Sequence, residues 1–124
     1  MSSNADTFRQ EVPDEPAYMV YSRDIVKDVF TEKEIQEMRQ RRLSAGVKSK
    51  AVYNSTIGPR PSDETGDRIM IDSNKYPIKS DITIYGDRVR IAIFGRRISS
   101  IFIQNKEFAN TLKSLVKYIL DHPK

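Results

Sequence analysis

The sequence predicts a single small α/β domain, in which a strand–helix–strand unit is followed by a β-meander and a C-terminal amphipathic helix. Three observations lead to this fold class. A helix with clear start and stop signals separates two short strand-like segments. Three alternating segments then follow, joined by short links that contain glycine. The last segment carries apolar residues at helical spacing, and at 124 residues the chain has the size of one domain.

The first half of the chain supplies the strand–helix–strand unit. Residues 1–16 hold two prolines and four acidic side chains, so we expect a disordered acidic tail followed by one domain over residues 17–124. The apolar segment AYMVYS, which starts at residue 17, predicts a buried strand. Thr31 and Glu34 form a capping box, and Gly46 is typical of a helix end. Residues 47–54 alternate and predict a second strand, parallel to the first because a helix connects them.

The second half predicts a meander closed by a helix. Residues 55–66 contain two glycines and two prolines and are expected to form a long loop, with a short strand at 68–72. Three further strands are expected at 78–85, 88–94 and 98–104. Asn105 should cap the final helix, whose apolar stripe should lie across the sheet: Phe108, Leu112, Leu115, Val116 and Ile119.

The two faces of the first predicted hairpin differ in polarity. One face is aliphatic and is expected to be core. The opposite face is mixed, and we expect it to be polar unless another element covers its aromatic residues: Asp81, Thr83, Tyr85, Arg88, Arg90, Ala92 and Phe94.

Residue types that carry common catalytic chemistry are scarce. The chain has no cysteine, and its single histidine, His122, is the third residue from the end of the given sequence. We therefore expect no metal site, no cofactor and no histidine-based nucleophilic catalysis. The first residues do not have the pattern of a secretory signal, and no apolar run is long enough to cross a bilayer. These features predict a cytoplasmic protein that is not an enzyme and has no contact with membranes.

Charge is distributed unevenly along the sequence. Residues 1–16 hold one basic against four acidic side chains, which leaves 20 basic and 13 acidic side chains, a net charge of +7, on the rest. A body of this charge can attract nucleic acid, although a small domain also carries such charge merely to stay soluble.

Several positions of the second half carry a family pattern. A Tyr-Gly-Asp-basic turn after an alternating strand occupies residues 85–88, and Asp81 begins the alternation. Lys106, Glu107 and Ala109 follow the third strand, while Arg42, Gly46 and Val47 form a matching helix–glycine–strand passage upstream. Over residues 18–120 the chain resembles the effector or sensor domain of TrmB-like transcription regulators, which is similar to half of a phospholipase D fold.

The resemblance implies a particular function. Active phospholipase D-type enzymes carry a His-x-Lys motif followed by aspartate, and this chain has no histidine there, so a non-catalytic relative is implied. Residues 1–16 are too few for the winged helix of such regulators. The expected function is a regulatory or sensor domain that forms a homodimer or binds a winged-helix regulator, with a small-molecule ligand.

Three surfaces and two sets of residues follow from this reading. The surfaces are the long loop, the hairpin around Tyr85 and the exposed edge of the meander. The expected ligand or partner residues are Arg60, Arg68, Tyr85 and Asp87. The alternative is a nucleic-acid-binding module that contacts phosphates through Arg39, Arg41, Arg42, Arg88, Arg90, Arg96 and Arg97. A phosphodiesterase that works without histidine is the third reading.

Overall fold

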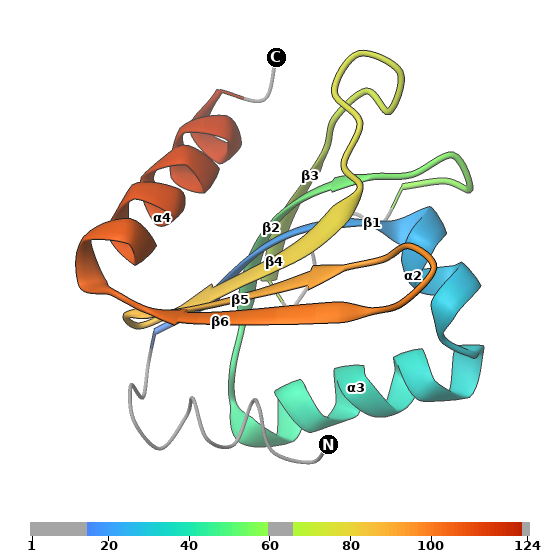
Figure 1. The fold of residues 1–124 in the computed structure, drawn as a ribbon, viewed down its shortest axis with the longest axis horizontal. Helices are drawn as coiled ribbons and strands as arrows, with labels where there is room; N and C mark the ends of the chain where they lie inside the picture. The colour runs from blue at the N-terminus through green and yellow to red at the C-terminus, as the bar shows by residue number, and fades with distance from the viewer. Residues whose placement is uncertain (1–14, 60–65, 123–124) are drawn as a thin grey trace.

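Six strands form one mixed sheet in the order β3-β2-β1-β4-β5-β6 over the residues described by the computed structural model, 15–59 and 66–122 (Figure 1). Helices lie against both faces of this sheet. Along the chain the elements are β1 (Ala17–Ser22), α2 (Arg23–Val29), α3 (Glu32–Ala45), β2 (Ser49–Asn54), β3 (Gly66–Met70), β4 (Ser80–Tyr85), β5 (Arg88–Ile93), β6 (Ser99–Gln104) and α4 (Lys106–Asp121).

The strand directions follow from the connections. β1 and β2 are parallel, as the sequence predicts. This is because α2 and α3 return the chain to the end of the sheet at which β1 begins, so that β2 runs in the same direction. β3 is also parallel to β2, whereas β4 pairs antiparallel with β1 and begins the predicted meander of β4, β5 and β6. The small α/β domain with a mixed sheet is therefore confirmed.

The capping signals of α3 form as predicted. The Thr31 hydroxyl accepts a hydrogen bond from the Glu34 backbone N–H (3.1 Å), and the Glu34 carboxylate accepts one from the Thr31 backbone N–H (2.8 Å). Gly46 ends the helix in the left-handed conformation, with φ of 74°.

Some predicted boundaries are wrong. The prediction omits α2, a helix of seven residues whose first turn is capped by the Ser22 hydroxyl. Seven residues are too few for a helical period to be recognised. β3 begins two residues earlier than expected, at Gly66, and β2 and β4 begin two residues later than expected, at Ser49 and Ser80. Strand ends depend on which neighbour they pair with, and local sequence does not determine that choice.

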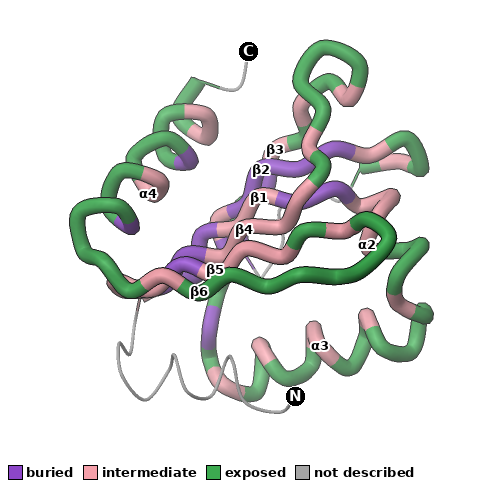
Figure 2. The backbone as a smooth tube through the Cα atoms, viewed as in Figure 1, coloured by how far each residue is buried: buried purple, intermediate pink, exposed green. Residues whose placement is uncertain are grey.

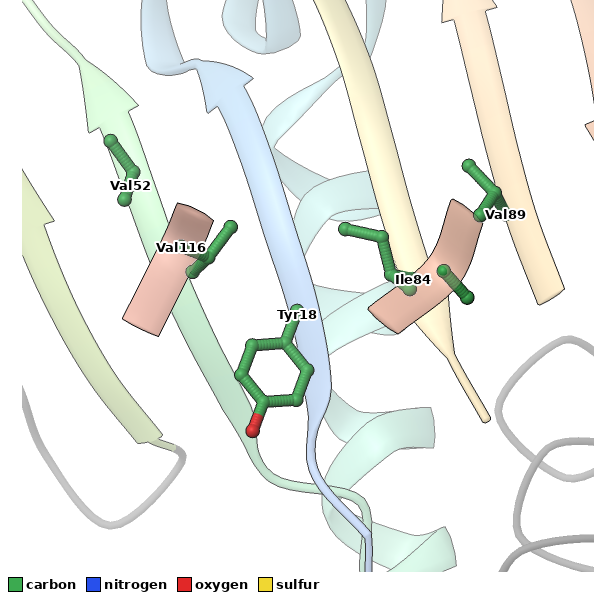
Figure 3. Packing of buried hydrophobic residues seen from close by; sticks show 6 residues of the cluster. Tyr18, Val52, Ile84, Val89 and Val116 are labelled. Carbon is green, nitrogen blue, oxygen red and sulfur yellow. The ribbon is translucent and has the colours of Figure 1, made fainter. Parts of the chain in front are cut away.

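The main hydrophobic core lies between the sheet and α4. Tyr18, Val52, Ile84 and Val89 point from four strands toward Ala109 and Val116 of α4 (Figure 3). The predicted helix stripe is only partly correct, because Phe108 and Leu115 remain 39% and 57% exposed. The stripe of α4 is wider than the surface that the helix covers.

Helices α2 and α3 lie on the opposite side of the sheet (Figure 1). Tyr21 and Tyr53 stack there with ring centroids 5.6 Å apart, and both are buried. Tyr85 is buried near the end of α3, in a cluster with Ala17 and Val47. The mixed face is thus partly covered by helices: Tyr85 and Arg68 are buried there, while Asp81, Arg88 and Arg90 are half-buried.

Candidate functional site: a groove beneath the two N-terminal helices

A groove of about 280 Å³ lies between the mixed face of the sheet and the helices α2 and α3. Its floor consists of strand residues, which include Met19, Tyr21, Arg68, Asp81, Thr83 and Arg90. Its roof comes from α2, the α2–α3 connection and α3, and includes Val26, Phe30, Ile35, Met38 and Arg42. The roof is mainly apolar, whereas the floor is mixed and carries most of the polar groups of the lining.

Strand register explains how the floor is assembled. Ala51 pairs with both Arg68 and Met19, and Met19 pairs in turn with Thr83. Thr83 then pairs with Arg90. Because directly opposite residues share a face, these five residues form one row across the sheet, with an arginine at each end.

The next row of the floor contains an unusual pair. The paired residues of β1 and β4 end at Val20 and Ile82. Continuing this antiparallel register by one residue places Tyr21 opposite Asp81, on the groove face. A phenol and a carboxyl group from distant parts of the chain thus both line the floor of the groove.

Both groups of this pair have a buried polar atom that lacks a partner. The hydroxyl oxygen of Tyr21 and the Oδ1 atom of Asp81 have no hydrogen-bond partner among the residues that the structure describes. Tyr21 as a whole is only 7% exposed. Leaving such an atom unsatisfied costs about 1–3 kcal/mol, and native proteins contain few of them. Two in the same groove indicate a place where a bound molecule would complete the hydrogen bonding.

The electrostatics of the groove centre on Asp81. Burial raises the pKa of Asp81 from 3.8 to about 6, while the nearby Arg90 guanidinium acts in the opposite direction. The carboxyl group therefore titrates near the acidic end of the physiological range. Its protonated form donates a hydrogen bond and its ionised form only accepts.

The roof is positioned by the local sequence of α3. Ile35, Met38 and Arg42 recur at intervals of three and four residues, so they lie on one side of the helix. The Thr31 capping box fixes where that helix starts, directly after Phe30. The roof therefore offers aliphatic and aromatic contacts, with one guanidinium near the C-terminal end of α3.

The lining of the groove is suited to binding a small molecule. Within the described residues, no three histidine, cysteine, aspartate or glutamate side chains gather where they could hold a metal ion. An apolar roof above a floor with a few convergent polar groups is the usual composition of a small-molecule site.

The four residues predicted for ligand or partner binding are not brought together. Arg68 is buried in β3 and lines the groove. Tyr85 is 1% exposed and packs within the protein, and Asp87 lies in the β4–β5 turn, where its carbonyl accepts a hydrogen bond from the Asn105 backbone N–H (2.9 Å). Arg60 falls outside the described residues. Their roles stay predictions.

The arginines of the alternative prediction are divided between the interior and the surface. Arg42 and Arg90 line the groove, and Arg39 and Arg88 are half-buried. Arg41, Arg96 and Arg97 are exposed, the last two in the connection between β5 and β6.

Sequence reasoning missed Tyr21 and Asp81 as site residues. Asp81 did carry a signal, because it is an acidic residue at the start of an otherwise apolar alternation. Tyr21 carried none, since a tyrosine in a short apolar strand is ordinarily a packing residue. Only the pairing of β1 with β4 shows that the two side chains share a groove.

Comparison with known proteins does not identify a relative: no family model, no curated protein and no solved structure matches this chain. None of the helices within residues 15–59 and 66–122 combines the length and apolar character required to cross a bilayer.

Proposed function

We propose that this chain is a non-catalytic regulatory domain that senses a small organic molecule in the groove between the sheet and α2–α3. The proposal agrees with the sequence resemblance to the effector domains of TrmB-like transcription regulators, including their phospholipase D-like fold. Such a domain would act through dimerisation or through a protein partner. The observation that carries the proposal is the pair of buried, unpartnered polar atoms on Tyr21 and Asp81 in one groove.

The argument from these atoms is energetic. A folded chain gains nothing by burying a hydroxyl and a carboxyl oxygen without partners, and it would be more stable with apolar groups of the same shape. A ligand that donates to Asp81 Oδ1 and bonds to the Tyr21 hydroxyl would offset both costs when it binds. The unbound groove is thus prepared for one kind of hydrogen-bonding pattern.

The dimensions and lining restrict the ligand. A cavity of about 150 Å³ holds a benzene molecule, so about 280 Å³ suits a compound of roughly twice that size. The ligand should present at least one hydroxyl or amine donor toward the floor. Its opposite side should be apolar enough to contact Phe30, Ile35 and Met38 in the roof.

The test is a ligand screen with matched variants. Thermal-shift and NMR chemical-shift measurements with a chemically diverse set of small metabolites should find a compound that binds this groove. Tyr21→Phe and Asp81→Asn should each weaken its binding about tenfold, because each removes or alters one hydrogen bond of roughly 1–1.5 kcal/mol. Tyr118→Phe should leave binding unchanged, since Tyr118 is 63% exposed on α4.

Two outcomes would overturn the proposal. One is that no compound binds. The other is that the compound binds the wild type, Tyr21→Phe and Asp81→Asn with equal affinity. Turnover of a phosphodiester by pure protein, lost on a point change in this chain, would contradict the non-catalytic part.

The nucleic-acid-binding alternative retains one specific observation in its favour. Arg96 and Arg97 are adjacent and exposed at the β5–β6 connection, where they could contact phosphates. Binding to duplex and single-stranded DNA at two salt concentrations tests this alternative. It requires an affinity that falls steeply with salt and is reduced by Arg96→Ala and Arg97→Ala together.

A further inference from the structure

β6 is an edge strand without the usual protection of an edge. Its segment Ser99–Gln104 contains no charged residue and no proline, the two commonest devices that keep edge strands from pairing with other chains. Five of its six residues are exposed, and Figure 2 shows β6 as an exposed strand over most of its length. Phe102 in its middle is 72% exposed, and Ile101 beside it is 42% exposed.

The hydrogen-bonding direction of each residue in β6 can be assigned. The Asn105 backbone N–H donates to the Asp87 carbonyl, and these two residues are opposite each other in the β5–β6 register. In an antiparallel pair, alternate residues direct their backbone groups toward the neighbour. The odd-numbered residues of β6 therefore bond to β5, and Ser100, Phe102 and Gln104 direct their N–H and C=O groups outward.

We propose that β6 pairs antiparallel with β6 of a second copy of this chain, about a two-fold axis at Phe102. In this register Phe102 lies opposite itself, and Ser100 lies opposite Gln104 of the second copy. All three residues are those with outward backbone groups, so the pairing joins donors to acceptors along the whole strand. The two six-stranded sheets become one continuous sheet.

The extent of strand overlap selects this register over its neighbours. Centred on Phe102, it pairs all three residues with outward backbone groups with one another. A register centred on Ile101 would leave Gln104 opposite Ile98, outside the strand, and one centred on Ile103 would leave Ser100 opposite Lys106, in α4.

The apolar side chains also continue across the proposed interface. Ile91 pairs with Ile101 inside one copy, and Val89 pairs with Ile103. Because Ile101 would lie opposite Ile103 of the second copy, one aliphatic row would run through both sheets on the α4 face. On the other face, Phe102 lies beside Arg90, which lines the groove. The interface and the groove therefore share one row of the sheet.

This inference deepens the proposed function, because it gives the dimerisation of the regulatory domain a surface and a register. The inference rests on the proposed function only for the role that the dimer would have in regulation. A second copy is the partner that fits, since the strand is complementary to itself in hydrogen bonding over its whole length and in the apolar side chains that it exposes. A strand from an unrelated protein would need the same complementarity by coincidence.

Cysteine cross-linking tests the register, because the natural chain contains no cysteine. In a hydrogen-bonded antiparallel pair, opposite Cα atoms are about 5.5 Å apart, which suits a disulfide. Phe102→Cys should therefore form a disulfide-linked dimer under mild oxidation. Ser100→Cys should not, since the two copies of residue 100 would be offset by four residues, about 13 Å along the strands.

Sedimentation of reduced variants tests the interface without a cross-link. The wild type should dimerise with increasing concentration, and Phe102→Lys should stay monomeric because it places two ammonium groups in contact at the axis. Met70→Lys is the matched control on β3, at the opposite edge, where Met70 is 45% exposed. It should dimerise as the wild type does.

The outcomes separate this inference from the proposed function. A monomeric wild type overturns the β6 interface, as does a dimer that Phe102→Lys leaves intact or a cross-link at residue 100 in place of 102. Ligand binding measured on Phe102→Lys is a separate readout. If that variant still binds ligand, the proposed sensor function holds whatever the oligomeric state. If neither the wild type nor the variant binds a ligand, the β6 dimer is still decided by the cross-linking and sedimentation results.

Discussion

At the scale of single residues, the most informative side chain is Asp81. It occupies a polar position in a strand whose other face is core, and α2 and α3 cover it only because the chain returns across the sheet. Burial disfavours the ionised form and raises the pKa of Asp81 to about 6. The folded state therefore holds a proton that the unfolded chain releases near pH 4.

This shift predicts how stability depends on pH. Since the folded pKa lies above the unfolded value, the contribution of Asp81 is fully present below about pH 4 and is lost as the pH rises through about 6. Asp81→Asn should raise the free energy of unfolding at pH 7 by about 1–2 kcal/mol, allowing for partial solvent screening. Urea unfolding at pH 7 and pH 4 checks this. Equal gains at both pH values would contradict the buried-carboxyl explanation.

At the scale of elements, the sequence predicts the main helix ends correctly. The capping box of α3, its glycine stop and the Asn105 cap of α4 all form where the residues predict them. Such signals are local, because each depends on hydrogen bonds between residues three or four positions apart. The short α2 escaped prediction, because seven residues provide too little periodicity.

The capping box gives a direct test at this scale. Thr31→Ala removes the hydroxyl that accepts from the Glu34 backbone N–H, and should lower the free energy of unfolding by about 1 kcal/mol. Ser44→Ala is the control, near the other end of the same helix, and should change stability by less than about 0.5 kcal/mol. Chemical denaturation measures both. Equal effects would show that the cap does not stabilise α3.

The two sides of α4 provide a second test. Val116 is 2% exposed in the main core, whereas its neighbour Leu115 is 57% exposed. Val116→Ala should cost about 2 kcal/mol through lost burial and a small cavity, while Leu115→Ala should be nearly neutral. Urea denaturation of both variants, made in the same helix, decides whether α4 packs in this orientation. The reverse order of effects would contradict it.

At the scale of the whole molecule, one carboxylate connects three separate parts of the chain. Glu15 accepts hydrogen bonds from the Gly86 backbone N–H and from the Lys113 ammonium group (3.0 Å), across 71 and 98 residues of sequence. The side chains of Lys113 and Glu15 are only 11% and 28% exposed. The segment before β1, the β4–β5 turn and α4 are therefore held together at one point.

Glu15→Gln tests this connection. Loss of the charge should lower the free energy of unfolding by about 1–2 kcal/mol, because the ion pair is partly buried and charge-assisted. Asp67→Asn, which breaks the exposed Lys50–Asp67 pair, should cost less than about 0.5 kcal/mol. Thermal and urea denaturation compare the two. If the two losses were equal, Glu15 would be an ordinary surface ion pair.

The amino-acid sequence alone determined the class of fold, the parallel β1–β2 pair, the meander and most helix ends, because alternation, helical spacing and caps act between near neighbours in the chain. Tertiary structure decided what lies on the partly covered second face of the sheet. Tyr21 and Asp81 are 60 positions apart, and only the antiparallel pairing of β1 with β4, beneath a helix that was not predicted, places them in one groove. Pairing between distant strands depends on the whole packed sheet, so no local pattern could reveal that site.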